Sequence, residues 1–176
     1  MPASDPNRRA AFDEAIGRFT DYINNHPQAQ DLETAIYGRA VASYQIEKYD
    51  DAIRDLELNL QRFPQSATLS STKNLLAVTL ATLGNAELVK GDATGTTKAF
   101  ALYKRATDSL REIIRQKEDI ALINEANFQL GEILLNQAGY SPEPERPALY
   151  AEAFAALRSV VPKEQVVRLQ EDKLRE

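Results

Sequence analysis

The feature that most constrains this fold is a pattern that recurs along the chain at an interval of 37 residues. Residues 12–16 (Phe-Asp-Glu-Ala-Ile) align with residues 49–53 (Tyr-Asp-Asp-Ala-Ile), and Pro27 aligns with Pro64. Within each copy, apolar residues recur every three or four positions, which is the period of one face of an α-helix. A unit repeated every 20–50 residues or so predicts a stack of similar modules.

The same periodicity predicts helices along the whole chain, and no segment alternates in the manner of a strand. Asp5 with Pro6 is expected to begin the first helix, and Asp31 to cap the second. The predicted fold class is therefore all-α with about eight helices. The first helix is expected at about 8–26, the second from Asp31 to a break at 48–50, and the third from there to a stop at 63–64. The fourth begins near 66–70 and either ends at Gly84 or continues through 85–90, and the next two are expected at about 97–117 and 119–137. The seventh includes 150–160, and Pro162 begins the eighth.

Small residues mark where these helices should meet. Two antiparallel helices approach closely only where one of them presents Gly or Ala to the other. Ala40 and Ala52 are the matching pair in consecutive helices, and Ala106 is the counterpart of Ala52 further along. A larger residue there would overpack the contact, at a cost of roughly 1–3 kcal/mol.

Residues 33–66, with Ala40, Ala52 and Pro64, resemble a tetratricopeptide repeat. The tail at 62–66 (Arg-Phe-Pro-Gln-Ser) is similar to repeats in bacterial envelope proteins of the outer-membrane assembly lipoprotein and cell-division coordinator types. The resemblance implies a right-handed α-solenoid of antiparallel helix pairs, forming one repeat domain over residues 1–176. It also implies a periplasmic or envelope-associated location.

The repeat alignment divides the chain into five segments. They are a helix at 8–26, a repeat at 31–66, an irregular repeat at 67–118 with an insertion at 86–102, an irregular repeat at 119–161 with an insertion at 140–149, and a C-terminal helix at 162–176. We interpret the glycine-rich stretch 91–95 as a connecting loop and the proline-rich stretch 142–147 as a rigid linker.

Stacked helix pairs present a concave groove, which is lined mainly by the first helix of each pair. The resemblance therefore implies a protein-protein interaction scaffold or adaptor that binds a peptide or a partner protein in this groove, in bacterial envelope assembly. Aromatic rings and amides suit an extended peptide. The expected lining residues are Tyr37, Val41, Tyr44, Gln45, Asn74, Val78, Phe128, Gln129 and Glu132.

Composition argues against catalysis and against nucleic acid. The chain has no cysteine and one histidine, His26, which removes most of the residues from which zinc sites and nucleophilic triads are built. Its 26 acidic residues outnumber 21 basic ones, whereas nucleic-acid binders usually carry a basic surplus. We expect a non-catalytic protein with no cofactor, no metal site and no transmembrane segment.

Self-association through the terminal helices is the alternative function, because repeat ends without polar caps tend to stack. It would involve Phe12, Phe19 and Ile23 at one end, and Val166, Val167 and Leu174 at the other. The first residues lack the basic and apolar regions of a signal peptide, and the last ones stop within helix-like sequence. We therefore expect a fragment of a longer protein.

Overall fold

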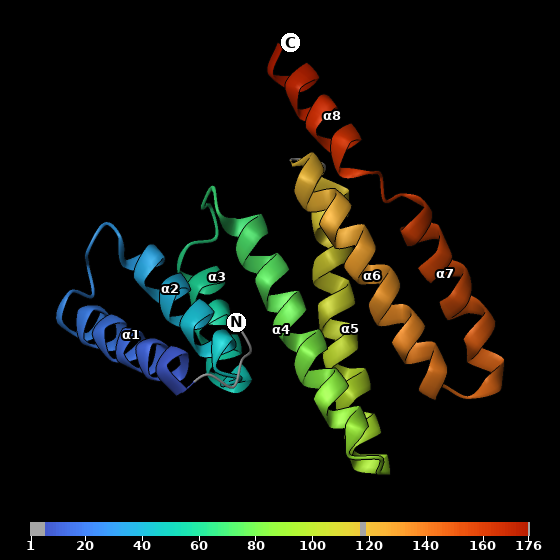
Figure 1. Cartoon of the computed structure of the whole chain (residues 1–176), viewed down its shortest axis with the longest axis horizontal. Coiled ribbons are helices and arrows are strands. Elements are labelled where there is room, and N and C mark those ends of the chain that lie inside the picture. The colour runs from blue at the N-terminus through green and yellow to red at the C-terminus, as the bar shows by residue number, and fades with distance from the viewer. Residues whose placement is uncertain (1–5, 117–118, 176) are drawn as a thin grey trace. The chain divides into compact units, whose positions relative to one another are not determined.

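The computed structural model describes residues 6–116 and 119–175, apart from the side chains of residues 173 and 174 (Figure 1). These residues form eight α-helices and one short 3-10 helix, with no strand, which confirms the all-α prediction. By its internal contacts the chain divides into two compact units, Met1–Thr79 and Leu80–Glu176, and the boundary between them falls within the fourth helix. The helices are α1 (Pro6–Asn25), α2 (Leu32–Gln45), α3 (Tyr49–Arg62), α4 (Leu69–Val89), α5 (Ala93–Gln116), α6 (Ile120–Tyr140), the 3-10 helix η1 (Glu143–Glu145), α7 (Arg146–Arg158) and α8 (Lys163–Arg175).

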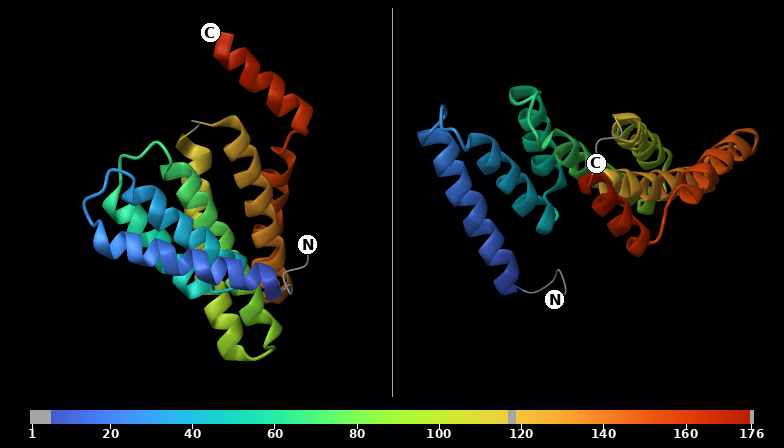
Figure 2. Two further views of the ribbon diagram at one scale, coloured as in Figure 1. Left: turned by 60° about the vertical axis from the view of Figure 1, so that its left-hand side comes forward. Right: turned by 90° about the horizontal axis from the view of Figure 1, so that it is seen from above.

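In the first unit, α2 packs against α1 on one side and against α3 on the other. The contacts between α1 and α2 run antiparallel, because the start of α1 meets the end of α2. Arg8 donates a hydrogen bond to Gln45, and Phe19 lies against Gly38. A Cβ atom added at Gly38 would lie 2.5 Å from Phe19 Cζ, so the two helices meet where only glycine leaves room. Figure 2 shows these helices from two further sides.

The pair formed by α2 and α3 is also antiparallel and contains the predicted alanines. Ala40 and Ala52 are both fully buried. Beside them, Arg39 forms a two-pronged ion pair with Asp55, with both N–O distances at 2.7 Å. Arg39 also donates to the Thr20 hydroxyl of α1 at 3.2 Å, so one guanidinium links three helices.

The second unit contains further antiparallel contacts. At the end of α4, Gly84 lies against the ring of Tyr103 in α5, and α5 packs in turn against α6. Gly131 of α6 lies against Leu157 of α7, and α8 makes a smaller contact with α6.

The glycine-rich loop expected at 91–95 is shorter than predicted, because α5 already begins at Ala93. Asp92 accepts a hydrogen bond from the Gly95 N–H at 2.6 Å, which satisfies one of the free amides of the first helical turn. Gly91 has a φ of +72°, a left-handed conformation that glycine adopts readily. The extra residues at 86–102 therefore lengthen two helices and enclose only a short turn.

The insertion expected at 140–149 is likewise mostly helical. Helix α6 continues to Tyr140 and α7 begins at Arg146, and the residues between them include the 3-10 helix η1. Pro147 lies in the first turn of α7, where its missing N–H is tolerated. The stretch predicted as a rigid linker at 142–147 is thus helical from Glu143 onward, and only Pro142 is extended. The cap predicted at Asp5 lies outside the described residues.

Candidate functional site

Two hollows lie on opposite sides of Thr34 in the first unit, and both use the beginning of α2. The α1–α2 hollow has a volume of about 300 Å³ and is lined by Arg18, Phe19, Tyr22, Asp31, Thr34 and Ala35. The α2–α4 hollow has a volume of about 360 Å³ and is lined by Glu33, Thr34, Tyr37, Thr68 and Ser71. Each hollow therefore combines one carboxylate with at least one aromatic ring.

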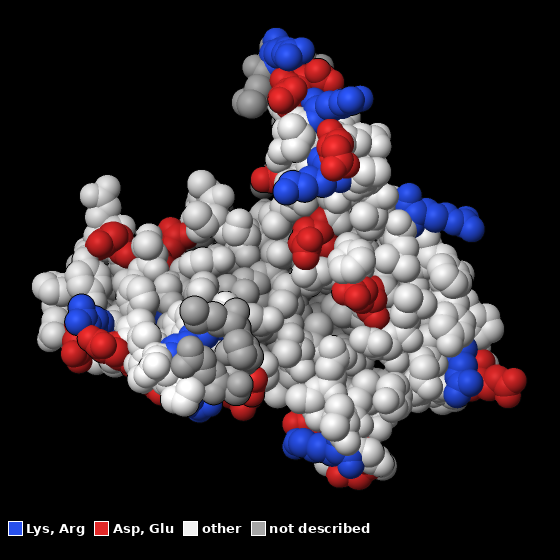
Figure 3. Space-filling view, in the orientation of Figure 1, with Lys and Arg blue, Asp and Glu red and all other residues white. Residues whose placement is uncertain are grey.

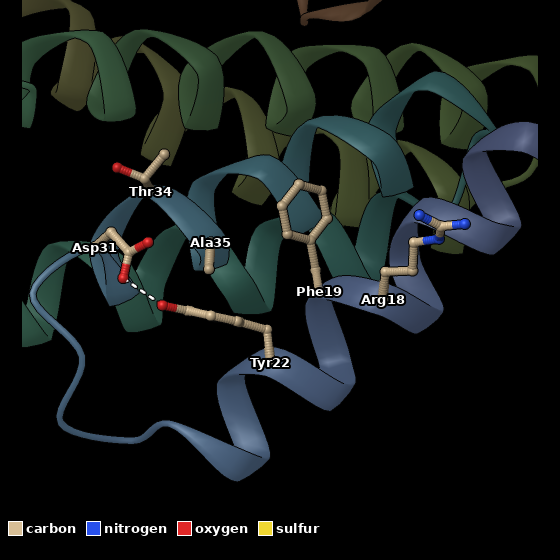
Figure 4. Close-up of a pocket in the computed structure, with 6 residues that line it drawn as sticks. All are labelled: Arg18, Phe19, Tyr22, Asp31, Thr34 and Ala35. Atoms are coloured by element: carbon tan, nitrogen blue, oxygen red, sulfur yellow. Dashed lines mark hydrogen bonds between the residues drawn. The ribbon is translucent and has the colours of Figure 1, made fainter.

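Figure 4 shows how the side chains of the α1–α2 hollow are arranged. Phe19 and Tyr22 extend from α1 toward α2, and the small Ala35 leaves space between the helices. The Tyr22 hydroxyl donates a hydrogen bond to Asp31 Oδ1. This bond to the carboxylate raises the pKa of Tyr22, because ionising the phenol would remove the proton that it donates.

Asp31 occupies the N-cap position of α2, but its side chain caps no backbone amide. The prediction that it caps the second helix is therefore wrong for the side chain, although the helix does begin at Leu32. The carboxylate has turned instead toward Tyr22 of the neighbouring helix.

In the α2–α4 hollow, Glu33 is held by two hydroxyl groups from the segment before α4. Both Ser66 and Thr68 donate to its Oε1 atom. The backbone carbonyl of Glu33 accepts a bond of 2.8 Å from the buried side chain of Asn59 in α3, which fixes the first turn of α2. The position of this carboxylate is therefore determined by three segments of the chain.

Tyr37 lies one turn further along α2 and forms the aromatic part of the same hollow. It is half-buried, and this burial raises the pKa of its hydroxyl. The hydroxyls of Thr34, Thr68 and Ser71 add hydrogen-bonding capacity around the ring.

Six of the predicted groove residues belong to the first unit, and their environments differ. Tyr37 lines a hollow, whereas Tyr44 lies against the ring of Tyr49 at 5.7 Å and Gln45 accepts a bond from Arg8 of α1. The remaining three, Val41, Asn74 and Val78, are half-buried and line neither hollow. The Oδ1 atom of Asn74 is buried without a hydrogen-bond partner among the described residues.

The other three predicted groove residues lie on α6 in the second unit. Phe128 is 42% exposed, Gln129 donates to Glu125 at 2.6 Å, and Glu132 is exposed. These side chains are accessible on their own helix, and none of them lines the two hollows.

Sequence reasoning did not single out Asp31 or Glu33 as binding residues. An acidic residue at the start of a helix is normally explained by capping and by the helix dipole. The signal that identifies them is tertiary, because their partners Tyr22, Ser66 and Thr68 come from other segments.

Comparisons with protein-family models, with curated proteins and with solved structures found no match to this chain. None of the helices in the described ranges combines the length and the hydropathy that a membrane span requires.

Proposed function

We propose that this chain is a tetratricopeptide-type right-handed α-solenoid, acting as a non-catalytic scaffold that binds a peptide or a partner protein. The antiparallel packing of neighbouring helices supports this proposal, as do the buried alanines Ala40 and Ala52 at the predicted register. The envelope-assembly role is part of the proposal and rests on the resemblance of residues 62–66 to envelope repeats.

The observation that carries the proposal is the hollow around Tyr37. In the repeat alignment, α2 and α4 are the first helices of successive repeats, and such helices line the concave groove of a solenoid. The α2–α4 hollow lies between these two elements, and Tyr37 was assigned to the groove from the repeat register. An aromatic ring among hydroxyl groups suits an extended segment, because the ring covers apolar atoms while hydroxyls pair with the peptide backbone.

Selection from a displayed library of random twelve-residue peptides tests this function directly. Peptides enriched on the wild-type chain should bind the Tyr37→Ala variant about tenfold more weakly, since interface tyrosines often contribute more than 1 kcal/mol or so. Tyr150→Ala is the matched control, because Tyr150 is a partly exposed tyrosine on α7 in the other unit.

Both variants should keep the helical circular dichroism of the wild type. Enriched peptides that bind Tyr37→Ala and wild type equally would remove Tyr37 from the groove. If no peptide is enriched, the scaffold proposal itself fails.

A second candidate function, self-association, is favoured by apolar side chains that remain exposed on the last two helices. Phe154 is 53% exposed on α7, and Val167 and Leu169 are 44% and 39% exposed on α8. Figure 3 shows α8 with charged side chains of both signs on its visible face.

The residues predicted to mediate self-association differ in accessibility. Phe12, Phe19 and Ile23 are half-buried in the first unit, and Val166 is buried. The side chain of Leu174 lies outside the described residues. Sedimentation velocity over a concentration series tests the candidate, and a monomer at every concentration would exclude self-association of this chain.

A further inference from the structure

We propose that the two hollows beside Thr34 bind a basic segment of the partner protein, with one lysine or arginine side chain in each. This inference deepens the proposed function and rests on it, because it names the chemistry of the partner that the scaffold would take. It is drawn from the two carboxylates, from the aromatic rings beside them, and from the way nearby arginines are already paired.

The two carboxylates share one arrangement. In each of them one oxygen accepts hydrogen bonds from hydroxyl groups: Asp31 Oδ1 from Tyr22, and Glu33 Oε1 from Ser66 and Thr68. The second oxygen, Oδ2 of Asp31 and Oε2 of Glu33, has no hydrogen-bond partner among the described residues. The hydroxyls therefore hold each carboxylate in position and leave an acceptor for a further donor. An ammonium or guanidinium group is the donor that gains most from a charged acceptor.

Aromatic rings stand beside both carboxylates. Phe19 and Tyr22 line the α1–α2 hollow, and Tyr37 lines the α2–α4 hollow. A ring face attracts a cation through its quadrupole, and the ring also covers the aliphatic stem of a lysine or arginine. Volumes of about 300 and 360 Å³ lie at the lower limit of small-molecule pockets, so they suit single side chains better than a cofactor.

Arg18, which lines one hollow, and Arg39 of α2 are both paired with carboxylates other than Asp31 and Glu33. Arg18 lines the α1–α2 hollow, but its guanidinium is paired with Glu14 at 2.6 Å. In Figure 4 its side chain points away from Asp31. Arg39 is held in the interior by Asp55. The cation-accepting oxygens therefore keep their negative charge available at the surface of α2.

The ordinary role of first-turn acids does not account for the whole arrangement. A carboxylate that only stabilised the helix start would accept from the backbone amides of that turn. Asp31 makes no such bond, and Glu33 is held by side chains from the segment before α4. Both groups are positioned by other elements, and each of them borders a hollow.

The test uses the full chain and fluorescein-labelled peptides taken from the library selection. If the inference holds, the enriched peptides carry at least two lysines or arginines. Acetylating one lysine removes its charge and should weaken binding about tenfold, because a charge-assisted hydrogen bond to the carboxylate is lost.

Asp31→Asn and Glu33→Gln should each weaken binding by a similar factor. Both amides keep an oxygen that can accept from the same hydroxyls, so these variants should retain their melting temperature. Asp21→Asn is the control for net charge, because Asp21 is an exposed acid of α1 that lines neither hollow. It should leave the affinity within about twofold of wild type, since an exposed charge is strongly screened.

The outcomes separate the two proposals. Enriched peptides that lack basic residues, or that bind Asp31→Asn and Glu33→Gln as tightly as wild type, overturn the basic-segment inference. The scaffold proposal survives that result if the same peptides still need Tyr37. Equal losses in all three acid variants, including Asp21→Asn, would indicate a diffuse charge effect and would also overturn the inference.

Discussion

Gly38→Ala is predicted to leave the chain less stable than Gly17→Ala does, although both replace a glycine in the interior of a helix. A Cβ atom at Gly38 would lie 2.5, 2.9 and 3.1 Å from three ring atoms of Phe19. A Cβ atom at Gly17 would meet nothing within 4 Å. The two substitutions therefore share their effect on helix propensity and differ in packing.

The magnitude follows from two terms. Alanine in a helix interior is favoured over glycine by about 0.8–1 kcal/mol, so Gly17→Ala should stabilise the chain by close to that amount. Gly38→Ala has the same gain, but forcing a methyl group into the contact costs roughly 1–3 kcal/mol. The difference between the two variants should thus be about 1–3 kcal/mol, because the propensity term cancels.

Urea unfolding followed by circular dichroism measures both free energies, provided the two variants have equal m-values. Combining Gly38→Ala with Phe19→Leu offers a second check. The smaller leucine should accept the methyl group, so the penalty of Gly38→Ala should largely disappear in that background. If Gly38→Ala stabilises the chain as much as Gly17→Ala does, the close approach of α1 and α2 at Phe19 is refuted.

Three further substitutions probe the packing and titration of buried groups. Ala52→Leu should destabilise the chain by roughly 1–3 kcal/mol, and an unchanged melting temperature would contradict the α2–α3 register. Arg39→Met should cost about 3–5 kcal/mol by leaving Asp55 buried without its partner, and the double variant with Asp55→Leu should recover most of this in urea unfolding. Burial raises the pKa of Tyr103 to about 12. The stability that the neutral phenol contributes is therefore fully present below pH 10, which is its ordinary pKa, and is lost as the pH rises through 12. Between pH 10 and pH 12 the free energy of unfolding of the wild type should fall by about 2–3 kcal/mol more than that of Tyr103→Phe.

The helices themselves follow from the sequence because their apolar stripe has to be buried by some neighbour, whichever neighbour that is. Ala40 and Ala52 were predicted at a close contact from spacing alone, and both are fully buried. Pro27 and Pro64 were predicted as helix stops, and α1 and α3 end two residues before them. Local pattern and local breakers are sufficient for these features.

The starts of α5 and α7, near Gly95 and Pro147, could not be predicted in the same way. Gly95 looks like a loop residue because glycine weakens a helix, yet it lies in the first turn of α5. A contact with another helix explains the glycine, because a Cβ atom there would lie 2.5 Å from the backbone oxygen of Glu87 in α4. Pro147 was assigned to a linker, although proline is well tolerated in the first turn of a helix.

For the candidate site, the repeat register identified Tyr37 but not the carboxylates on either side of Thr34. Single-sequence reasoning explains an acid at a helix start by its own helix. The hydroxyls that orient Asp31 and Glu33 belong to α1 and to the segment before α4. Their contribution becomes visible only when the three elements are brought together.

The position of both hollows follows from the place of α2 within its unit. Because α2 packs against α1 on one side and α3 on the other, its buried residues are spread around the helix, and they include Leu32, Ala35, Ile36, Ala40 and Ala42. Little of its surface is left for a partner, and the part that remains includes Glu33, Thr34 and Tyr37, all within its first two turns. Both hollows lie at the start of α2, and each is bordered there by one carboxylate, Asp31 in the first and Glu33 in the second. The packing of the first unit therefore determines which part of α2 remains accessible to a partner, and Asp31 and Glu33 supply the negative charge of that part.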